Sequence, residues 1–130
     1  DRKKFKELLS LKPVRTIRGV APIALMSDSY PCPHTLKGIG PCTYCPGGPG
    51  SPFGDVPQSY TGHEPTTIRA IRNKYDSYLQ VFNRLEQYVL LGHVPDKVEL
   101  IVMGGTFPAL EESYQDTFIK DAIKAMNDFS

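Results

Sequence analysis

The sequence contains no tryptophan, only three cysteines and no long apolar run. No hydrophobic stretch approaches the roughly 18 residues that a membrane span requires, so we expect no membrane partner. Nothing near the first residue resembles a secretory signal, and that residue is Asp rather than Met, as we expect of a fragment or a processed chain. An odd number of cysteines argues against a disulfide framework and for a reducing compartment, which predicts a cytoplasmic location.

Charge of one sign is also scarce overall. The 15 Lys and Arg against 14 Asp and Glu leave a net charge of +1, which excludes a uniformly basic nucleic-acid binder. Residues 1–18 nevertheless form a basic N-terminal arm, which makes them a candidate phosphate-contacting segment because clustered cations release counterions from a polyanion. A solvated helix end accounts for the same charges equally well. The basic residues of the arm are Arg2, Lys3, Lys4, Lys6, Lys12, Arg15 and Arg18.

Proline and glycine, by contrast, are abundant. Nine of the 12 prolines and eight of the 11 glycines lie between Gly19 and Pro65. Because residues 27–62 show no helical period, we predict one long ordered loop there. A loop of this length needs an organising agent, since its own side chains cannot bury enough surface to offset the backbone entropy. All three cysteines lie inside residues 27–62, which we call the cysteine loop.

Regular elements are predicted on both sides of the loop. Residues 5–11 predict a short basic amphipathic helix that ends before Pro13. Residues 19–26 and 97–103 predict two strands, the second of them buried and parallel to its neighbour. Residues 114–129 predict an amphipathic helix.

Between the loop and the second strand, one apolar stripe with spacings of three and four predicts a helix or a pair of consecutive helices. Pro65 suits its first turn, Asp76 is a candidate cap in the middle, and Gly92 is a candidate stop. The stripe consists of Ile68, Ile71, Tyr75, Tyr78, Phe82, Leu85 and Val89.

These elements form two successive β/α units, so the expected fold class is α/β. Two units leave a sheet incomplete, because a full β/α barrel takes about 200 residues or more. We therefore expect the remaining units to come from a longer parent or from a partner.

The cysteines form the pattern C-x9-C-x2-C, with Cys32, Cys42 and Cys45. Thiolates select zinc, copper(I) or iron–sulfur clusters. The three thiolates and His34 could complete a closed zinc shell, and three thiolates alone could hold a cubane cluster with one open iron. Spacing leaves both alternatives open, and unliganded thiols are the less favoured third.

The surroundings of the cysteines favour a cluster with a small-molecule ligand. In a parallel β/α architecture, ligands bind at the carboxyl ends of the strands, where both the cysteine loop and the turn after residue 103 are expected. Gly104 and Gly105 in that turn allow backbone groups to approach a ligand closely.

The loop resembles the radical S-adenosylmethionine motif in its longer-spaced form. Together with other segments it is similar to the family of the Elongator catalytic subunit, and the resemblance runs from about residue 14 to residue 127. The segments that carry it are 42–49, 58–62, 64–65, 69–71, 75–76, 91–93 and 103–107.

The resemblance implies that residues 19–130 are the N-terminal portion of a partial (β/α)6 radical-SAM barrel. It implies a 4Fe-4S cluster on the three cysteines, with S-adenosyl-L-methionine on its free iron. Tyr44 would pack near the adenine of this cofactor. Gly104, Gly105 and Thr106 would meet its methionine amino group, with Thr106 standing where the commoner motif has Glu.

The implied function is modification of the wobble uridine of tRNA at C5, by radical carboxymethylation with acetyl-CoA as co-substrate. Family members continue into further barrel units and an acetyltransferase domain, so we expect this chain alone to be inactive. Its expected partners are tRNA, the rest of the same enzyme and, in a eukaryote, other Elongator subunits. The alternative is a zinc-stapled RNA-binding module without radical chemistry.

Several other residues have structural interpretations. His63 and His93 are expected at the surface or as caps. Tyr75 and Tyr78 are expected in the core. The basic residues at 69, 72 and 74 suit a solvated helical face as well as they suit phosphate contacts.

Overall fold

The structure is a computed structural model that describes residues 2–9, 14 and 16–130. Lys12 and Arg15, two of the predicted phosphate contacts, lie outside these residues. The elements in chain order are α1 (Arg2–Leu9), β1 (Val20–Met26), α2 (Pro33–Leu36), α3 (Pro65–Arg72), α4 (Ser77–Leu90), β2 (Lys97–Met103), the 3-10 turn η1 (Phe107–Ala109) and α5 (Glu112–Phe129).

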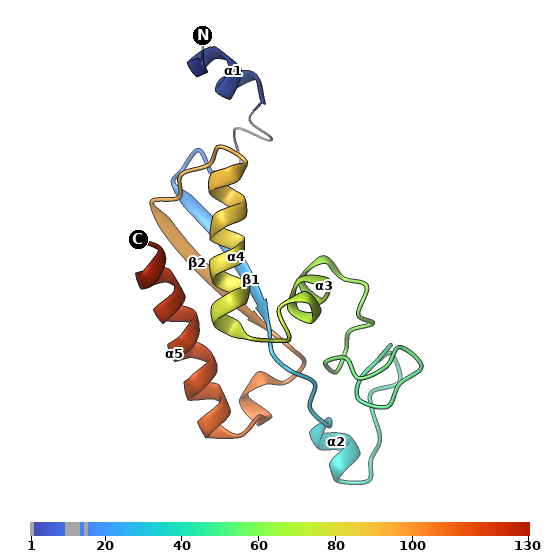
Figure 1. Cartoon of the computed structure of the whole chain (residues 1–130). Coiled ribbons are helices and arrows are strands. Elements are labelled where there is room, and N and C mark those ends of the chain that lie inside the picture. The colour runs from blue at the N-terminus through green and yellow to red at the C-terminus, as the bar shows by residue number, and fades with distance from the viewer. Residues whose placement is uncertain (1, 10–13, 15) are drawn as a thin grey trace.

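The two strands are parallel neighbours, as their sequences predict. Their register runs from Val20 opposite Lys97 to Met26 opposite Met103. A parallel pair needs a long crossover, and the cysteine loop, α3 and α4 together supply it (Figure 1). The predicted order of two β/α units is therefore confirmed, and the two strands do not by themselves test a barrel.

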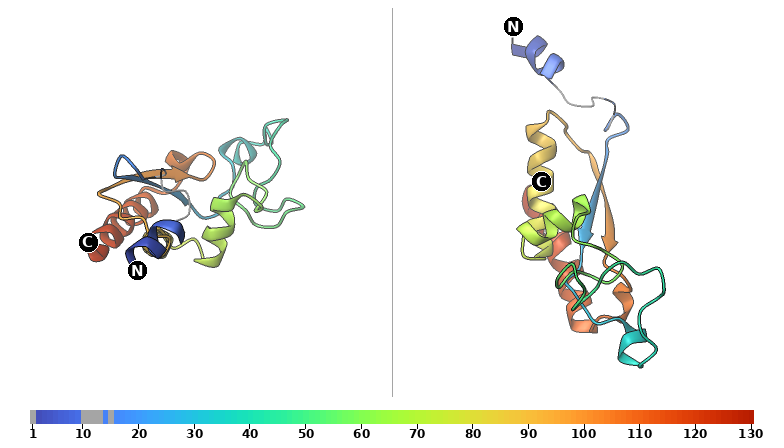
Figure 2. Two further views of the ribbon diagram at one scale, coloured as in Figure 1. Left: turned by 90° about the horizontal axis from the view of Figure 1, so that it is seen from above. Right: turned by 90° about the vertical axis from the view of Figure 1, so that its right-hand side faces the viewer.

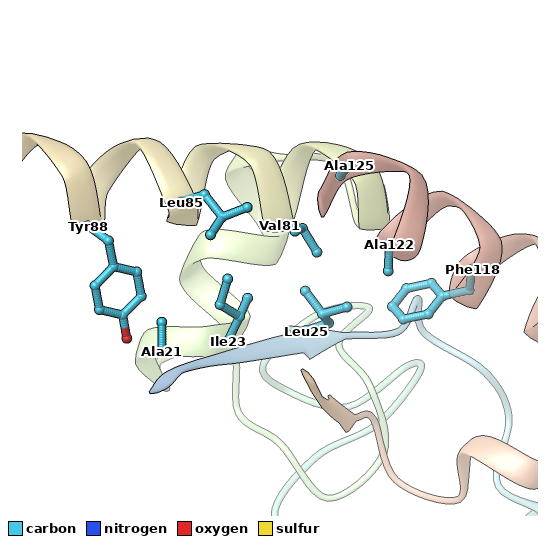
Figure 3. Packing of buried hydrophobic residues seen from close by; sticks show 9 residues of the cluster. All are labelled: Ala21, Ile23, Leu25, Val81, Leu85, Tyr88, Phe118, Ala122 and Ala125. Atoms are coloured by element: carbon cyan, nitrogen blue, oxygen red, sulfur yellow. The ribbon is translucent and has the colours of Figure 1, made fainter. Parts of the chain in front are cut away.

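The core lies between the sheet and two helices. Figure 2 shows α4 and α5 on the same side of the strands. In Figure 3, side chains of α4 and α5 point toward Ile23 and Leu25 of β1, which are fully buried. Ala122 and Ala125 of α5 are also fully buried, and their small size allows this helix to pack close to α4.

The opposite face of the sheet is open, which corrects the prediction of a buried second strand. Lys97 and Glu99 are exposed, and the side chain of Ile101 is 43% exposed. The reason is that α4 and α5 cover only one face, so alternate residues of β2 face away from the core.

The long apolar stripe belongs to two helices whose buried faces are not continuous. Lys74 and Tyr75 adopt left-handed conformations, with φ of 52° and 57°, and end α3. The predicted pair of consecutive helices is confirmed. The stripe does not mark the buried face of α3, however, where Thr67 and Ala70 are buried and Ile68 and Ile71 are partly exposed.

Other boundaries follow the predictions. The Asp76 carboxylate caps α4 by accepting a hydrogen bond from the Leu79 N–H at 2.8 Å. Gly92 follows α4 with a φ of +86°, as expected of a helix stop. Residues 27–62 are mostly loop, but the short helix α2 lies inside them and was not predicted.

The N-terminal helix and His93 follow their predictions only in part. The basic N-terminal helix is confirmed as α1, but Phe5, Leu8 and Leu9 of its apolar face are exposed. His93 is 4% exposed rather than at the surface. Its Nδ1 lies 2.9 Å from the Thr16 hydroxyl, and its ring packs edge-on against Tyr88, so it ties the segment before β1 to α4.

Candidate functional site

Both strands end at the same edge of the sheet, and a hydrogen bond joins the residues at their ends. The Ser27 N–H donates to the Met103 carbonyl at 2.9 Å. At Gly104, where φ is +133°, an added Cβ would lie 1.9 Å from the Ser27 hydroxyl. Only a glycine allows this close approach, so the two segments that follow the strands start side by side.

A cavity of about 370 Å³ lies beyond this edge. All three cysteines line it, together with the turn after β2, so the structure brings together the two segments that the sequence placed at the carboxyl ends of the strands. The lining residues are Cys32, Pro33, His34, Cys42, Tyr44, Cys45, Gln58, Ser59, Tyr60, Gly105 and Thr106.

The remaining predicted residues of the cofactor site lie at or near this cavity. Gly104 lines a small adjoining pocket that it shares with Cys32, Gln58 and Thr106. Tyr44 lines the main cavity with a side chain that is 86% exposed. An exposed aromatic ring at a cavity mouth is available to stack on a planar ligand.

Local turns position the cysteines. Pro33 occupies the first turn of α2, and the Cys32 carbonyl accepts the Leu36 N–H at 2.9 Å, so Cys32 lies at the start of this helix. The Cys45 N–H donates to the Cys42 carbonyl at 2.9 Å, which folds these two residues into one tight turn. The C-x2-C spacing thus corresponds to a turn that directs both thiols to the same cavity.

Cys45 has the most elaborate surroundings of the three. The Gln58 side-chain amide donates a hydrogen bond to its Sγ at 2.7 Å. Partial burial opposes ionisation of Cys45, but hydrogen bonds with Gln58 and with the backbone of Gly47 and Ser59 outweigh it and lower the pKa of the thiol. A thiolate is the form that binds soft metals.

Gln58, Ser59 and Tyr60 line the cavity and were missed by sequence reasoning, and of these Gln58 makes the closest contact to Cys45. It belongs to a segment that carries the family resemblance, but a lone glutamine in a loop gives no sign of its contacts. Its amide also donates to the Gly47 carbonyl at 3.0 Å. One side chain therefore joins residues 45–47 to the segment at residue 58, where the loop folds back on them.

Glu64 closes the far end of the loop. Its carboxylate accepts hydrogen bonds from the Thr61 N–H at 2.8 Å, the Gly62 N–H at 3.1 Å and the Thr67 hydroxyl at 3.0 Å. Burial raises the pKa of Glu64, but hydrogen bonds from the backbone and side chain of Thr61, from the backbone of Glu64 itself and from the Thr67 hydroxyl outweigh it and bring the pKa down to about 2. The loop is therefore fastened where it enters α3.

The donor set of the cavity has the chemistry that an iron–sulfur cluster needs, because three thiols line one space. Among residues 2–9, 14 and 16–130, no three His, Cys, Asp or Glu side chains are grouped closely enough to hold a single metal ion. The ligand roles of the cysteines stay predictions.

The basic arm lies elsewhere. Figure 1 shows α1 at the end of the sheet opposite to α2 and the cysteine loop. Lys4 and Arg18 are exposed, as a phosphate-contacting role requires. Contact between this arm and a nucleic acid stays a prediction.

Comparison with known proteins gives an unambiguous relationship. No profile of a known protein family matches the chain. The tRNA uridine(34) acetyltransferase of Methanocaldococcus infernus is 53% identical over 128 residues, which are 98% of this chain and 23% of that protein. Elongator complex protein 3 of Homo sapiens is 51% identical over 126 residues, which are 97% of this chain and 23% of that protein.

The fold and the cavity define an α/β protein with a cysteine-lined cavity at the carboxyl ends of its strands. With about half of its residues identical to these relatives, the chain belongs to the family of the tRNA uridine(34) acetyltransferases and Elongator complex protein 3. It spans less than a quarter of the length of these relatives. None of the described helices is long and apolar enough to cross a bilayer.

Proposed function

We propose that this chain supplies the iron–sulfur cluster loop and part of the S-adenosyl-L-methionine site of an enzyme that modifies the wobble uridine of tRNA. The observation that carries the proposal is the common cavity of Cys32, Cys42, Cys45 and the turn at Gly105 and Thr106. The names of the relatives support tRNA modification at uridine 34.

Each residue has a defined part in this proposal. The three cysteines would hold a 4Fe-4S cluster by three of its irons, and the fourth iron would be available to the amino and carboxyl groups of the cofactor. Tyr44 offers an aromatic face to the adenine. The backbone at 104–106 is assigned to the methionine end of the cofactor, because Gly105 and Thr106 line the same cavity as the three cysteines.

A reduced cluster held there would supply one electron to the sulfonium of S-adenosyl-L-methionine, whose C5'–S bond would break to give methionine and the 5'-deoxyadenosyl radical. The protein contributes the positioning of the cofactor against the cluster. The acetyl-CoA site, the remaining barrel units and the acetyltransferase domain are assigned to the part of such an enzyme outside this chain, so we expect the chain alone not to complete the carboxymethylation.

The zinc-stapled RNA-binding module is the second candidate, and its supporting observation is that His34 lines the same cavity. One observation favours the cluster. Gly105 and Thr106 line the same cavity as the three thiols, so a small-molecule ligand of an open iron would have backbone and hydroxyl groups beside it.

Electron paramagnetic resonance tests the cofactor site directly. The protein is reconstituted anaerobically with iron and sulfide, reduced, and measured with and without S-adenosyl-L-methionine. We expect the added cofactor to change the spectrum, because it binds the open iron. An unchanged spectrum in the wild-type protein would refute this assignment.

Two threonine variants refine the same measurement. Thr106→Val removes a hydroxyl from the cavity, and we expect more cofactor to be needed for the spectral change. Thr117→Val makes the same change on α5, where the hydroxyl donates to the Ser113 carbonyl at 2.8 Å. We expect Thr117→Val to titrate like the wild-type protein.

A further inference from the structure

Gln58 lies in the cysteine loop, beside Gly105 of the glycine turn that follows β2 (Gly104 and Gly105). Its side-chain nitrogen lies within hydrogen-bond distance of two acceptors. It donates to the Cys45 sulfur at 2.7 Å and to the Gly47 carbonyl at 3.0 Å. Both acceptors belong to residues 45–47, so the amide nitrogen is directed toward that segment.

Two glycines enclose Gln58 from opposite segments. A Cβ added at Gly48 would lie 2.4 Å from the Gln58 Oε1 and 2.8 Å from its Cδ. A Cβ added at Gly105 would lie 3.1 Å from both the Cβ and the carbonyl oxygen of Gln58. The side chain is thus confined between the segment around Gly48 and the turn after β2. A confined donor loses little conformational entropy when it binds its acceptor.

We propose that Gln58 is a positioning residue for Cys45, which fixes the sulfur against the glycine turn and makes a cluster bound there easier to reduce. The inference rests on the proposed function, because it concerns the cluster that Cys45 would hold. Neither the cysteine pattern nor the glycine turn predicts this role for Gln58.

The physical reason is the charge on sulfur. A cluster that gains an electron becomes more negative, and part of that charge resides on its cysteine sulfurs. A hydrogen bond to such a sulfur stabilises the reduced form more than the oxidised form, so it raises the reduction potential. A neutral amide donor does this without adding a charged group to the cavity.

The experiment measures the midpoint potential of the reconstituted protein, with electrons supplied by an electrode. Gln58→Leu removes the donor at similar size, and Gln58→Glu keeps the shape but replaces the donor by a negative charge. We expect the potential to become more negative in the order wild type, Gln58→Leu, Gln58→Glu. Gln87→Leu makes the same change at an exposed position of α4 and is expected to leave the potential unchanged.

Each outcome decides a different point. If the wild-type protein takes up no cluster, the proposed function fails. If all three forms have one potential and one iron content, the inference about Gln58 fails while the proposed function stands. Variants that keep the wild-type circular dichroism but lose iron support the positioning role. Variants that lose both the wild-type circular dichroism and iron overturn it, because Gln58 would then serve the fold of the loop.

Discussion

The side-chain amide of Gln80, on α4, makes two hydrogen bonds to the backbone of Met26, the last residue of β1. Its Oε1 accepts the Met26 N–H at 2.9 Å, and its Nε2 donates to the Met26 carbonyl at 3.0 Å. Both residues are buried. The cysteine loop begins at the next residue. This pair of hydrogen bonds, which we call the clamp, therefore determines where the loop leaves the sheet.

We therefore predict that Gln80→Leu lowers the free energy of unfolding by about 2 to 3 kcal/mol, because two buried backbone groups lose their partners. Urea denaturation measures this change. The matched control is Gln87→Leu on the exposed face of the same helix, with an expected effect within about 0.5 kcal/mol. Equal effects at the two positions would contradict the role given to the clamp.

Gly104 is predicted to tolerate no side chain. Gly104→Ala would place a methyl group on the Ser27 hydroxyl and force the strand ends apart, at a cost of about 1 to 3 kcal/mol. Gly50→Ala is the control, because Gly50 also has a positive φ, of +73°, but no atom lies within 4 Å of an added Cβ. Thermal unfolding is expected to show a clearly smaller loss for Gly50→Ala, of about 1 kcal/mol or less.

The Glu64 carboxylate is predicted to stabilise the loop in a pH-dependent way. Its folded pKa is about 2, below the usual value of 4.5, so its contribution is complete above pH 4.5 and is lost as the pH falls toward 2. Glu64→Gln is expected to cost about 1 to 2 kcal/mol at pH 6. Unfolding measured from pH 6 to pH 2 is expected to bring the two proteins together, and a constant difference would count against this interpretation.

The basic arm is predicted to add salt-dependent affinity for tRNA. Replacing Lys3, Lys4 and Lys6 by Gln removes three cations, and we expect the slope of log affinity against log salt to decrease by about 2 to 3. Replacing Lys97 and Lys120, which are exposed on the sheet and on α5, is the control and is expected to change the slope less. If the slope of the arm variant matched that of the wild type, the arm would be a solvated helix end.

The sequence predicted the regular elements well because their signals are local. Residues 97–103 were predicted as a strand and form β2 with the same bounds. The strand prediction for 19–26 differs from β1 by one residue. A β-branched run between turn residues, or a cap such as Asp76, contains most of the information that determines such an element.

The misses depend on contacts that are distant in sequence. The burial of His93 requires Thr16, 77 residues away, as its partner. The open face of β2 is an exception, because Lys97 and Glu99 alternate with Val98 and Leu100 in the sequence itself, and a period of two indicates a half-buried strand. Gln58 acquires its place only when the loop folds back on Cys45, 13 residues earlier.

The sequence predicted part of the candidate site, because some of its signals are local and others depend on distant contacts. The strand order and the glycine turn placed Cys32, Cys42 and Cys45 at one edge with Gly105 and Thr106, and all five line the cavity. The hydrogen bonds that hold the loop in shape, from Gln58 and to Glu64, could not be predicted, because glutamine and glutamate are common in loops and have no distinctive spacing.

Metal analysis of anaerobically prepared protein tests the central claim most directly. Iron, sulfide and zinc are measured after reconstitution in the wild type and in a variant with all three cysteines replaced by serine. The account predicts about four iron atoms per chain in the wild type, none in the variant and no stoichiometric zinc in either. One zinc and no iron in the wild-type protein, or the same iron content without the cysteines, would contradict it.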